Sequence, residues 1–154
     1  LTAQHDVDSG ILRGSEVNAF LGKLQAWCPH EPCNLKLLYR ASVDGFDASS
    51  FHAKCDRSTS TLTLVKVDSG RGCESIVGGY ADTSWSQATA TYPNNSSKGF
   101  IFSLKNGTDK INARDADDDM FPRAAKYPID DRARQFAIIC HATEGPRFGN
   151  FDLW

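Results

Sequence analysis

Residues 61–67 read Thr-Leu-Thr-Leu-Val-Lys-Val, and residues 99–105 read Gly-Phe-Ile-Phe-Ser-Leu-Lys. Leu62 and Leu64 alternate with other residues in the first stretch, as Phe100, Phe102 and Leu104 do in the second. A period of two is typical of a β-strand that turns one face toward a hydrophobic core. Both stretches are therefore predicted to be strands of a sheet.

Three further segments have strand character. Leu35, Leu37 and Tyr39 alternate with their neighbours, which predicts a strand over Leu35–Ala41. Short apolar or β-branched runs bounded by turn residues occur at Ser75–Tyr80 and at Phe136–His141. The second of these runs is apolar enough to predict a central strand.

Helical spacing occurs only in the first third of the chain. Val17, Phe20, Leu21 and Leu24 fall at i, i+3, i+4 and i+7, which predicts a helix from Ser15, as its N-cap, to about Trp27. A shorter helix is predicted over Ala48–Lys54, with Asp47 as its N-cap.

The segments that join the predicted strands are too short and too polar for crossover helices, which makes a parallel sheet improbable. We expect a mainly β, α+β fold: an antiparallel two-sheet sandwich flanked by a few short helices. The chain's 154 residues predict a single domain over 1–154, which we expect to be a segment of a longer chain.

Charge and hydropathy exclude two classes of partner. The formal net charge is -2, so the chain lacks the basic surface that nucleic-acid binding requires. It contains no run of 18 apolar residues, so we expect no membrane span.

The cysteines and asparagines leave the cellular compartment open. Five cysteines are too few for a disulfide framework and odd in number, but Cys28 and Cys33 would form a disulfide in an oxidising compartment. Glycosylation acceptors occur at Asn94, Asn95 and Asn106, all in turn-like polar stretches. Because Asn, Ser and Thr collect in loops anyway, these acceptors favour the secretory route only weakly.

Two clusters have the chemistry of metal ligands but lack the spacing. The first begins like a calcium loop, but Met120 stands where the loop needs glycine and Lys126 where it needs glutamate. The second supplies thiolate and imidazole ligands for zinc at unconvincing intervals. The first cluster comprises Asp115, Asp117, Asp118 and Asp119, and the second Cys28, His30, Cys33, His52 and Cys55. We therefore expect no bound metal and no other cofactor.

No motif of nucleophilic catalysis or of phosphate binding is present in the chain. It has no G-x-S-x-G, H-E-x-x-H, G-x-x-x-x-G-K-[ST] or G-x-G-x-x-G sequence. A thiol enzyme of oxidant defence would use Cys55 or Cys140. Cys55 follows Lys54, but it stands at the C-terminal end of its predicted helix, where the helix dipole disfavours a thiolate. We expect Cys55 to be structural.

Five strings in the chain are similar to those of the TLDc domain family, in the same order. They are Leu37–Phe46 continuing into Phe51–Asp56, then Thr61–Lys66, then Gly78-Gly79-Tyr80 with Ser84-Trp85, then Phe100–Leu104, and finally Gly145–Trp154. As structure, these strings put Gly45 and Gly145 at turns and put Gly78 and Gly79 where a strand bends or is closely approached. Their aromatic residues are expected in the core: Tyr39, Phe46, Phe51, Trp85, Phe100 and Phe102.

The resemblance implies a function as well as a fold. Members of the family are associated with protection against oxidative stress and with binding the vacuolar proton-pumping ATPase, and no agreed reaction is attached to the domain. It therefore implies a noncatalytic protein-interaction or scaffolding domain in the cytoplasm. The alternatives are a thiol-based oxidant-defence enzyme and an extracellular glycosylated structural or adhesive module. The chain departs from the family pattern at Val77, where phenylalanine is usual before the glycine pair, and in the acidic, proline-bearing segment Asn112–Gln135.

Overall fold

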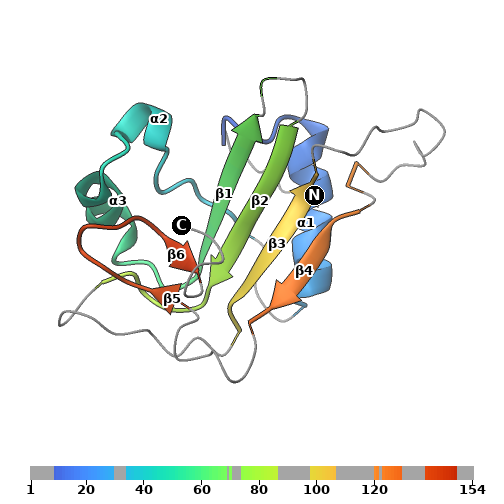
Figure 1. The fold of residues 1–154 in the computed structure, drawn as a ribbon. Coiled ribbons are helices and arrows are strands. Elements are labelled where there is room, and N and C mark those ends of the chain that lie inside the picture. Colours follow the sequence, from blue (N-terminus) through green and yellow to red (C-terminus); the bar gives the residue numbers. More distant parts are fainter. Residues whose placement is uncertain are drawn as a thin grey trace. The chain divides into compact units, whose positions relative to one another are not determined.

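A computed structural model describes residues 9–29, 34–68, 70, 74–86, 98–106, 120–121, 123–129 and 138–148 of the chain. Helices precede strands along this part of the sequence (Figure 1). The elements are α1 (Ser15–Trp27), α2 (Ala41–Asp44), α3 (Ala48–Cys55), β1 (Thr61–Asp68), β2 (Glu74–Ala81), β3 (Phe100–Lys105), β4 (Ala125–Pro128), β5 (Ile138–Ile139) and β6 (Arg147–Phe148).

The strands β1, β2, β3 and β4 form one antiparallel sheet in that order, as their arrows show in Figure 1. β5 and β6 form a two-stranded antiparallel sheet, in which Ile138 lies opposite Phe148 and Ile139 opposite Arg147. Two strands of two residues each do not make the second layer of a sandwich. The described residues therefore have an α+β fold with one four-stranded sheet, and the predicted two-sheet sandwich is not seen in them.

Residues Leu1–Leu37, Val65–Val77 and Ser103–Ala125 form one compact unit, which contains α1. The helix is the predicted one, with Val17, Phe20, Leu21 and Leu24 all buried. Its predicted cap is wrong by one residue, because Gly14 is the N-cap and Ser15 is the first helical residue. Instead of a hydroxyl cap, the Glu16 carboxylate accepts a hydrogen bond from Arg13 N–H, with 3.0 Å between Oε2 and N.

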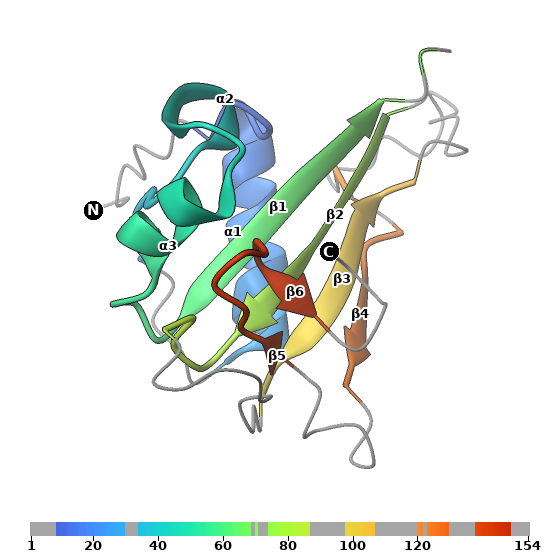
Figure 2. The ribbon, with the colours of Figure 1, turned by 60° about the vertical axis from the view of Figure 1, so that its left-hand side comes forward.

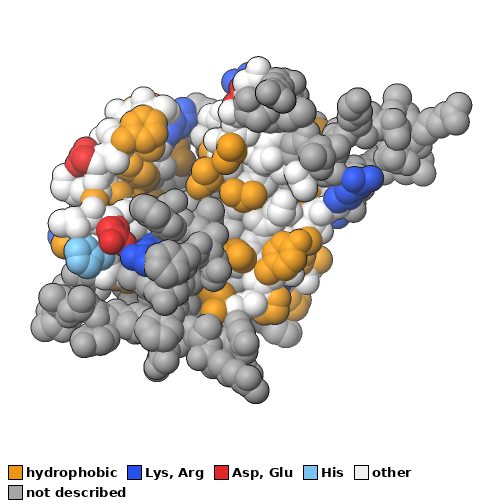
Figure 3. Space-filling model, viewed as in Figure 1, with side chains coloured by type: hydrophobic (Ala, Val, Ile, Leu, Met, Phe, Trp, Pro, Cys, Tyr) orange, Lys and Arg blue, Asp and Glu red, His pale blue; other side chains and the backbone are white. Residues whose placement is uncertain are grey.

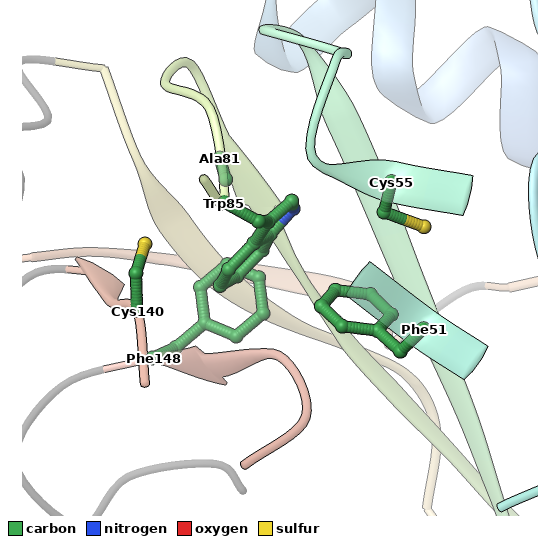
Figure 4. Close-up of a cluster of buried hydrophobic side chains, with 6 residues drawn as sticks. All are labelled: Phe51, Cys55, Ala81, Trp85, Cys140 and Phe148. Atoms are coloured by element: carbon green, nitrogen blue, oxygen red, sulfur yellow. The ribbon is translucent and has the colours of Figure 1, made fainter. Parts of the chain in front are cut away.

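The second compact unit consists of Leu38–Leu64, Gly78–Phe102 and Lys126–Trp154, and an aromatic cluster forms its core. Figure 4 shows the rings of Phe51, Trp85 and Phe148 turned toward one another. The Trp85 centroid lies 5.5 Å from that of Phe51 and 5.5 Å from that of Phe148, both edge to face. Trp85 also donates its indole N–H to Thr61 Oγ1 over 2.8 Å, which satisfies its buried polar atom.

Gly78 and Gly79 in β2 are points of close approach, which is one of the two roles that the sequence left open for them. A Cβ on Gly78 would lie 2.1 Å from Thr63 O, and one on Gly79 would lie 2.6 Å from two carbons of the Phe148 ring. Since real Cβ contacts are not that short, any side chain here would displace a backbone or a core ring. Gly79 therefore makes room for Phe148 of the aromatic cluster, and Gly78 for the backbone of β1 and the ring of Phe102.

The strand predicted over Leu35–Ala41 is wrong. Residues 34–40 have no regular structure, none of 35–41 is buried, and α2 begins at Ala41. Arg40 N–H donates to the Asp44 carboxylate, with 2.8 Å between N and Oδ2, so this donor serves the start of a helix instead of a sheet. An alternation of only three residues did not reveal that competing hydrogen bond.

Two other segments differ from the sequence prediction. β4 was not predicted, because Ala-Lys-Tyr-Pro lacks a clear alternation and ends in proline. The predicted central strand at Phe136–His141 is reduced to β5 among the described residues, and residues 136 and 137 lie outside them.

Candidate functional site

The segment Tyr39–Asp47, which we call the α2 corner, is held by its own hydrogen bonds. The Tyr39 hydroxyl donates to Gly45 O over 2.5 Å. Gly45 has a φ of 103°, which glycine adopts without the steric cost of a side chain. A Cβ at Gly45 would lie 2.9 Å from Asp47 Oδ2, so the predicted turn glycine has both a conformational and a steric reason.

Charged groups tie the α2 corner to α3. Lys54 Nζ donates to Asp44 Oδ1 over 2.8 Å, and hydrogen bonds from Lys54 and from Arg40 N–H lower the pKa of the Asp44 carboxyl. Asp47 is the predicted N-cap of α3 and accepts from Ser50 N over 3.1 Å. Hydrogen bonds from the Ser49 and Ser50 hydroxyls lower the pKa of Asp47 to about 2. Figure 2 shows α2 and α3 side by side.

The α2 corner carries two exposed apolar side chains. Phe46 is 85% exposed and Val43 is 73% exposed, and Figure 3 shows hydrophobic side chains at the surface over α2. The sequence prediction that Phe46 is a core aromatic is wrong. Of the other five predicted core aromatics, Tyr39 is partly buried and packs against Phe51. The remaining four are buried: Phe51, Trp85, Phe100 and Phe102. The Phe46 ring lies on a turn that internal hydrogen bonds hold in place, and it stays outside the core.

His52 on α3 is surrounded by hydrogen-bond acceptors. Its Nδ1 lies 2.7 Å from Asp56 Oδ1, and its Nε2 lies 3.0 Å from both His141 O and Glu144 O. Burial acts to lower the pKa of His52, but the hydrogen bonds that the ring donates to Asp56 and to the two carbonyls outweigh it and raise the pKa. His52 is one of the candidate zinc ligands in the sequence, and no local pattern pairs it with a turn 89 residues away.

Neither described candidate thiol is in an activating environment. Burial, with a contribution from the Asp56 charge, raises the pKa of Cys55 to about 11. The buried Cys140 Sγ lies 3.5 Å from Ser84 O, to which its thiol can donate. Both cysteines pack in the buried cluster with the aromatic rings (Figure 4). A nucleophilic cysteine needs a lowered pKa and access to solvent, so both side chains have the character of packing residues.

The remaining candidate residues are only partly within the described segments. Cys28 follows α1 and is partly buried, and Asn106 follows β3 and is exposed. In the described part of the chain, no group of three or more His, Cys, Asp or Glu side chains is arranged to hold a metal ion. The candidates that lie outside the described residues are His30, Cys33, Asn94, Asn95, Asp115, Asp117, Asp118 and Asp119.

The fold and these contacts define an α+β domain with a stabilised, apolar-tipped corner beside its aromatic core. Residues 9–154 match the TLDc domain, and the chain belongs to that family. The match confirms the resemblance seen in the sequence strings. Neither the curated proteins nor the solved structures gave a match to this chain. Among the described helices, none has the length and apolar character that crossing a bilayer requires.

Proposed function

We propose that this TLDc domain is a noncatalytic protein-interaction or scaffolding domain that binds its partner through the α2 corner. The observation that carries the proposal is the 85% exposure of Phe46 on a turn that is fixed by hydrogen bonds. Removing an exposed aromatic side chain from water favours binding of the partner that covers it, and aromatic residues are enriched among interface hot spots.

The internal contacts of the α2 corner support this role. The Tyr39 hydroxyl, the Asp44 carboxylate and the Asp47 carboxylate each hold a part of the turn that carries Phe46 and Val43. A preorganised surface loses less conformational entropy when it binds. Since Asp44 is already paired with Lys54, the apolar tip is flanked by an internally neutralised pair and not by an isolated charge.

The family resemblance identifies the partner to test first. TLDc domains are associated with binding the vacuolar proton-pumping ATPase and with protection against oxidative stress. We propose a cytoplasmic domain that contacts such an assembly through Phe46 and Val43. Oxidant protection would then follow from the assembly that it binds and would need no reaction on the domain itself.

A binding assay with the purified vacuolar proton-pumping ATPase tests the proposal. We expect Phe46→Ser to weaken binding at least about tenfold, as loss of an interface hot spot does. Tyr127→Ser is the matched control, since Tyr127 is also an exposed aromatic, at 53%, but lies on β4. No measurable binding by the wild-type chain would reject the pump as partner, and equal affinity of the two variants would reject the α2 corner.

The thiol-enzyme alternative has a separate test. Peroxide consumption with excess reductant is measured for the wild-type chain and for Cys55→Ser and Cys140→Ser. Because the pKa of Cys55 is raised to about 11, we expect no more consumption than a free thiol gives. Turnover that disappears in either variant would make the domain an enzyme.

The extracellular alternative rests on one described feature, the exposure of Asn106 directly after β3. A glycan there would project into solvent without disturbing the strand. Intact mass spectrometry of the native protein, before and after reduction, reports glycans at Asn94, Asn95 or Asn106 and a Cys28–Cys33 disulfide together. A protein with neither modification would contradict the secretory interpretation.

A further inference from the structure

His52 joins two segments that are far apart in the sequence. It lies on α3, while the carbonyl groups of His141 and Glu144, which it contacts, belong to the turn between β5 and β6. The same His141 oxygen accepts from Glu144 N–H over 2.9 Å, closing the turn. The His52 side chain is 13% exposed, so it is largely sheltered but within reach of solvent.

The groups around the His52 ring are all acceptors, so hydrogen bonds on both sides of the ring require a proton on each ring nitrogen. A carboxylate oxygen faces Nδ1, and two carbonyl oxygens face Nε2, and none of these groups can donate. A neutral imidazole has one N–H and satisfies only one side. The imidazolium form satisfies both sides, so the geometry of the closed turn selects the protonated ring.

The other charged and titratable groups around the ring are mostly engaged with one another. On the turn, the Glu144 carboxylate accepts from Arg147 Nη1 over 2.9 Å, and His141 Nδ1 lies 2.8 Å from the Thr143 hydroxyl oxygen. On α3, Lys54 pairs with Asp44, and the Cys55 thiol is buried. Among the described residues, Asp56 is therefore the charge that faces His52.

We propose that His52 is a proton-operated latch, which holds the His141–Glu144 turn against α3 when protonated and releases it when the proton is lost. This inference is independent of the proposed function. The released proton comes from Nε2, because the hydrogen bond to the Asp56 carboxylate is charge-assisted and retains the Nδ1 proton. The Nε2 lone pair then faces two carbonyl oxygens, and the turn moves away while the proton passes to water.

The anchors on both sides of the turn confine the motion. Before the turn, Cys140 is buried and its Sγ lies 3.5 Å from Ser84 O. After the turn, Phe148 has no exposed surface and packs against Trp85. Opening therefore exposes the turn without disassembling the core. Figure 3 shows histidine and charged side chains together at the surface on this side of α3.

Amide hydrogen exchange as a function of pH tests the latch. The Glu144 amide reports turn opening, since its N–H donates to His141 O. After correction for intrinsic exchange, we expect its opening constant to rise up to tenfold per pH unit between the pKa that His52 has in the open turn, where Asp56 still holds Nδ1, and its raised pKa in the closed turn. A constant that does not change with pH in the wild-type chain would overturn the proposal.

Three variants sharpen the test. Asp56→Asn removes the charge that holds the proton, so the rise should begin at lower pH, and the His52 titration followed by NMR should shift with it. His52→Gln should abolish the pH dependence. His141→Asn, the control, should keep it, because the hydrogen bond to His52 is made by the backbone oxygen of His141. A His52 titration at or below about pH 6.5 in the wild-type chain would contradict the latch even if His52→Gln fails to fold.

Discussion

Phe46 and Phe51 are separated by five positions in the chain and have opposite surroundings. Phe51 is 4% exposed and packs edge to face on Tyr39 and Trp85, whereas Phe46 is 85% exposed. Between them lies Asp47, which ends the α2 corner and caps α3. The contrast teaches that residue type alone did not determine burial here. The position of the α3 N-cap did, because it directs Phe51 inward and leaves Phe46 on the turn.

Truncating the aromatic cluster should have the largest effect. Trp85 is 1% exposed and contacts both Phe51 and Phe148, so Trp85→Ala should lower the free energy of unfolding by about 3–5 kcal/mol. Denaturant unfolding measures the loss. A loss under about 1 kcal/mol would show that the cluster is not the core of its unit and would end the contrast with the α2 corner.

Filling the space beside the cluster should have the next largest effect. Gly79→Ala would place a Cβ 2.6 Å from the Phe148 ring, and overpacking of this kind costs about 1–3 kcal/mol. Gly22→Ala is the control. Gly22 lies in α1 with nothing within 4 Å of its Cβ, so alanine should stabilise the domain by about 0.5–1 kcal/mol. If Gly79→Ala were tolerated as well as Gly22→Ala, the close approach of Phe148 to Gly79 would be refuted.

The α2 corner itself is broken by Gly45→Ala. Alanine at a φ of 103° and a ψ of 157° costs about 1–3 kcal/mol, and its Cβ would also meet Asp47. Gly145→Ala serves as the comparison, because nothing lies within 4 Å of a Cβ there. We expect Gly45→Ala to lower the melting temperature and to weaken partner binding together. A stable Gly45→Ala variant with wild-type binding would show that the turn does not position Phe46.

Phe46→Ser should have the smallest effect on stability. Since the Phe46 ring is exposed and does not pack in the core, the free energy of unfolding should change by no more than about 0.5 kcal/mol. Chemical denaturation of this variant and of Trp85→Ala compares the exposed ring with the buried cluster directly. A loss of several kcal/mol would mean that Phe46 is buried in solution.

Local patterns in the sequence predicted a substantial part of the fold. The spacing of Val17, Phe20, Leu21 and Leu24 predicted α1, and Asp47 predicted the start of α3. The strands β1, β2 and β3 were predicted from alternation and from apolar runs, and the family strings predicted a bend or a close approach at Gly78 and Gly79. For these helices and strands the determining pattern lies within a few residues or recurs along one element, whereas the groups that approach Gly78 and Gly79 belong to other strands.

The failures have two causes, competing local hydrogen bonds and long-range contacts. The segment Leu35–Ala41 alternates like a strand, but α2 starts there because Arg40 N–H donates to the Asp44 carboxylate. Phe46 was placed in the core by the string that contains it, although the Tyr39 to Gly45 hydrogen bond fixes it outside. His52 contacts a turn 89 and 92 residues away, and no local pattern encodes a contact of that range. The α2 corner therefore depends on side-chain hydrogen bonds between near neighbours that alternation does not reveal, and the His52 contacts became visible only with the tertiary structure.

The most direct test of the account is an NMR footprint of the domain in the presence of the purified proton-pumping ATPase. If the α2 corner is the binding surface, the signals of Ala41–Asp47 should shift or broaden first, while those of the exposed Tyr127 on β4 should not change. The Phe46→Ser variant should lose the effect. Perturbations confined to other surfaces, with the signals of Ala41–Asp47 unchanged at saturation, would contradict the central claim.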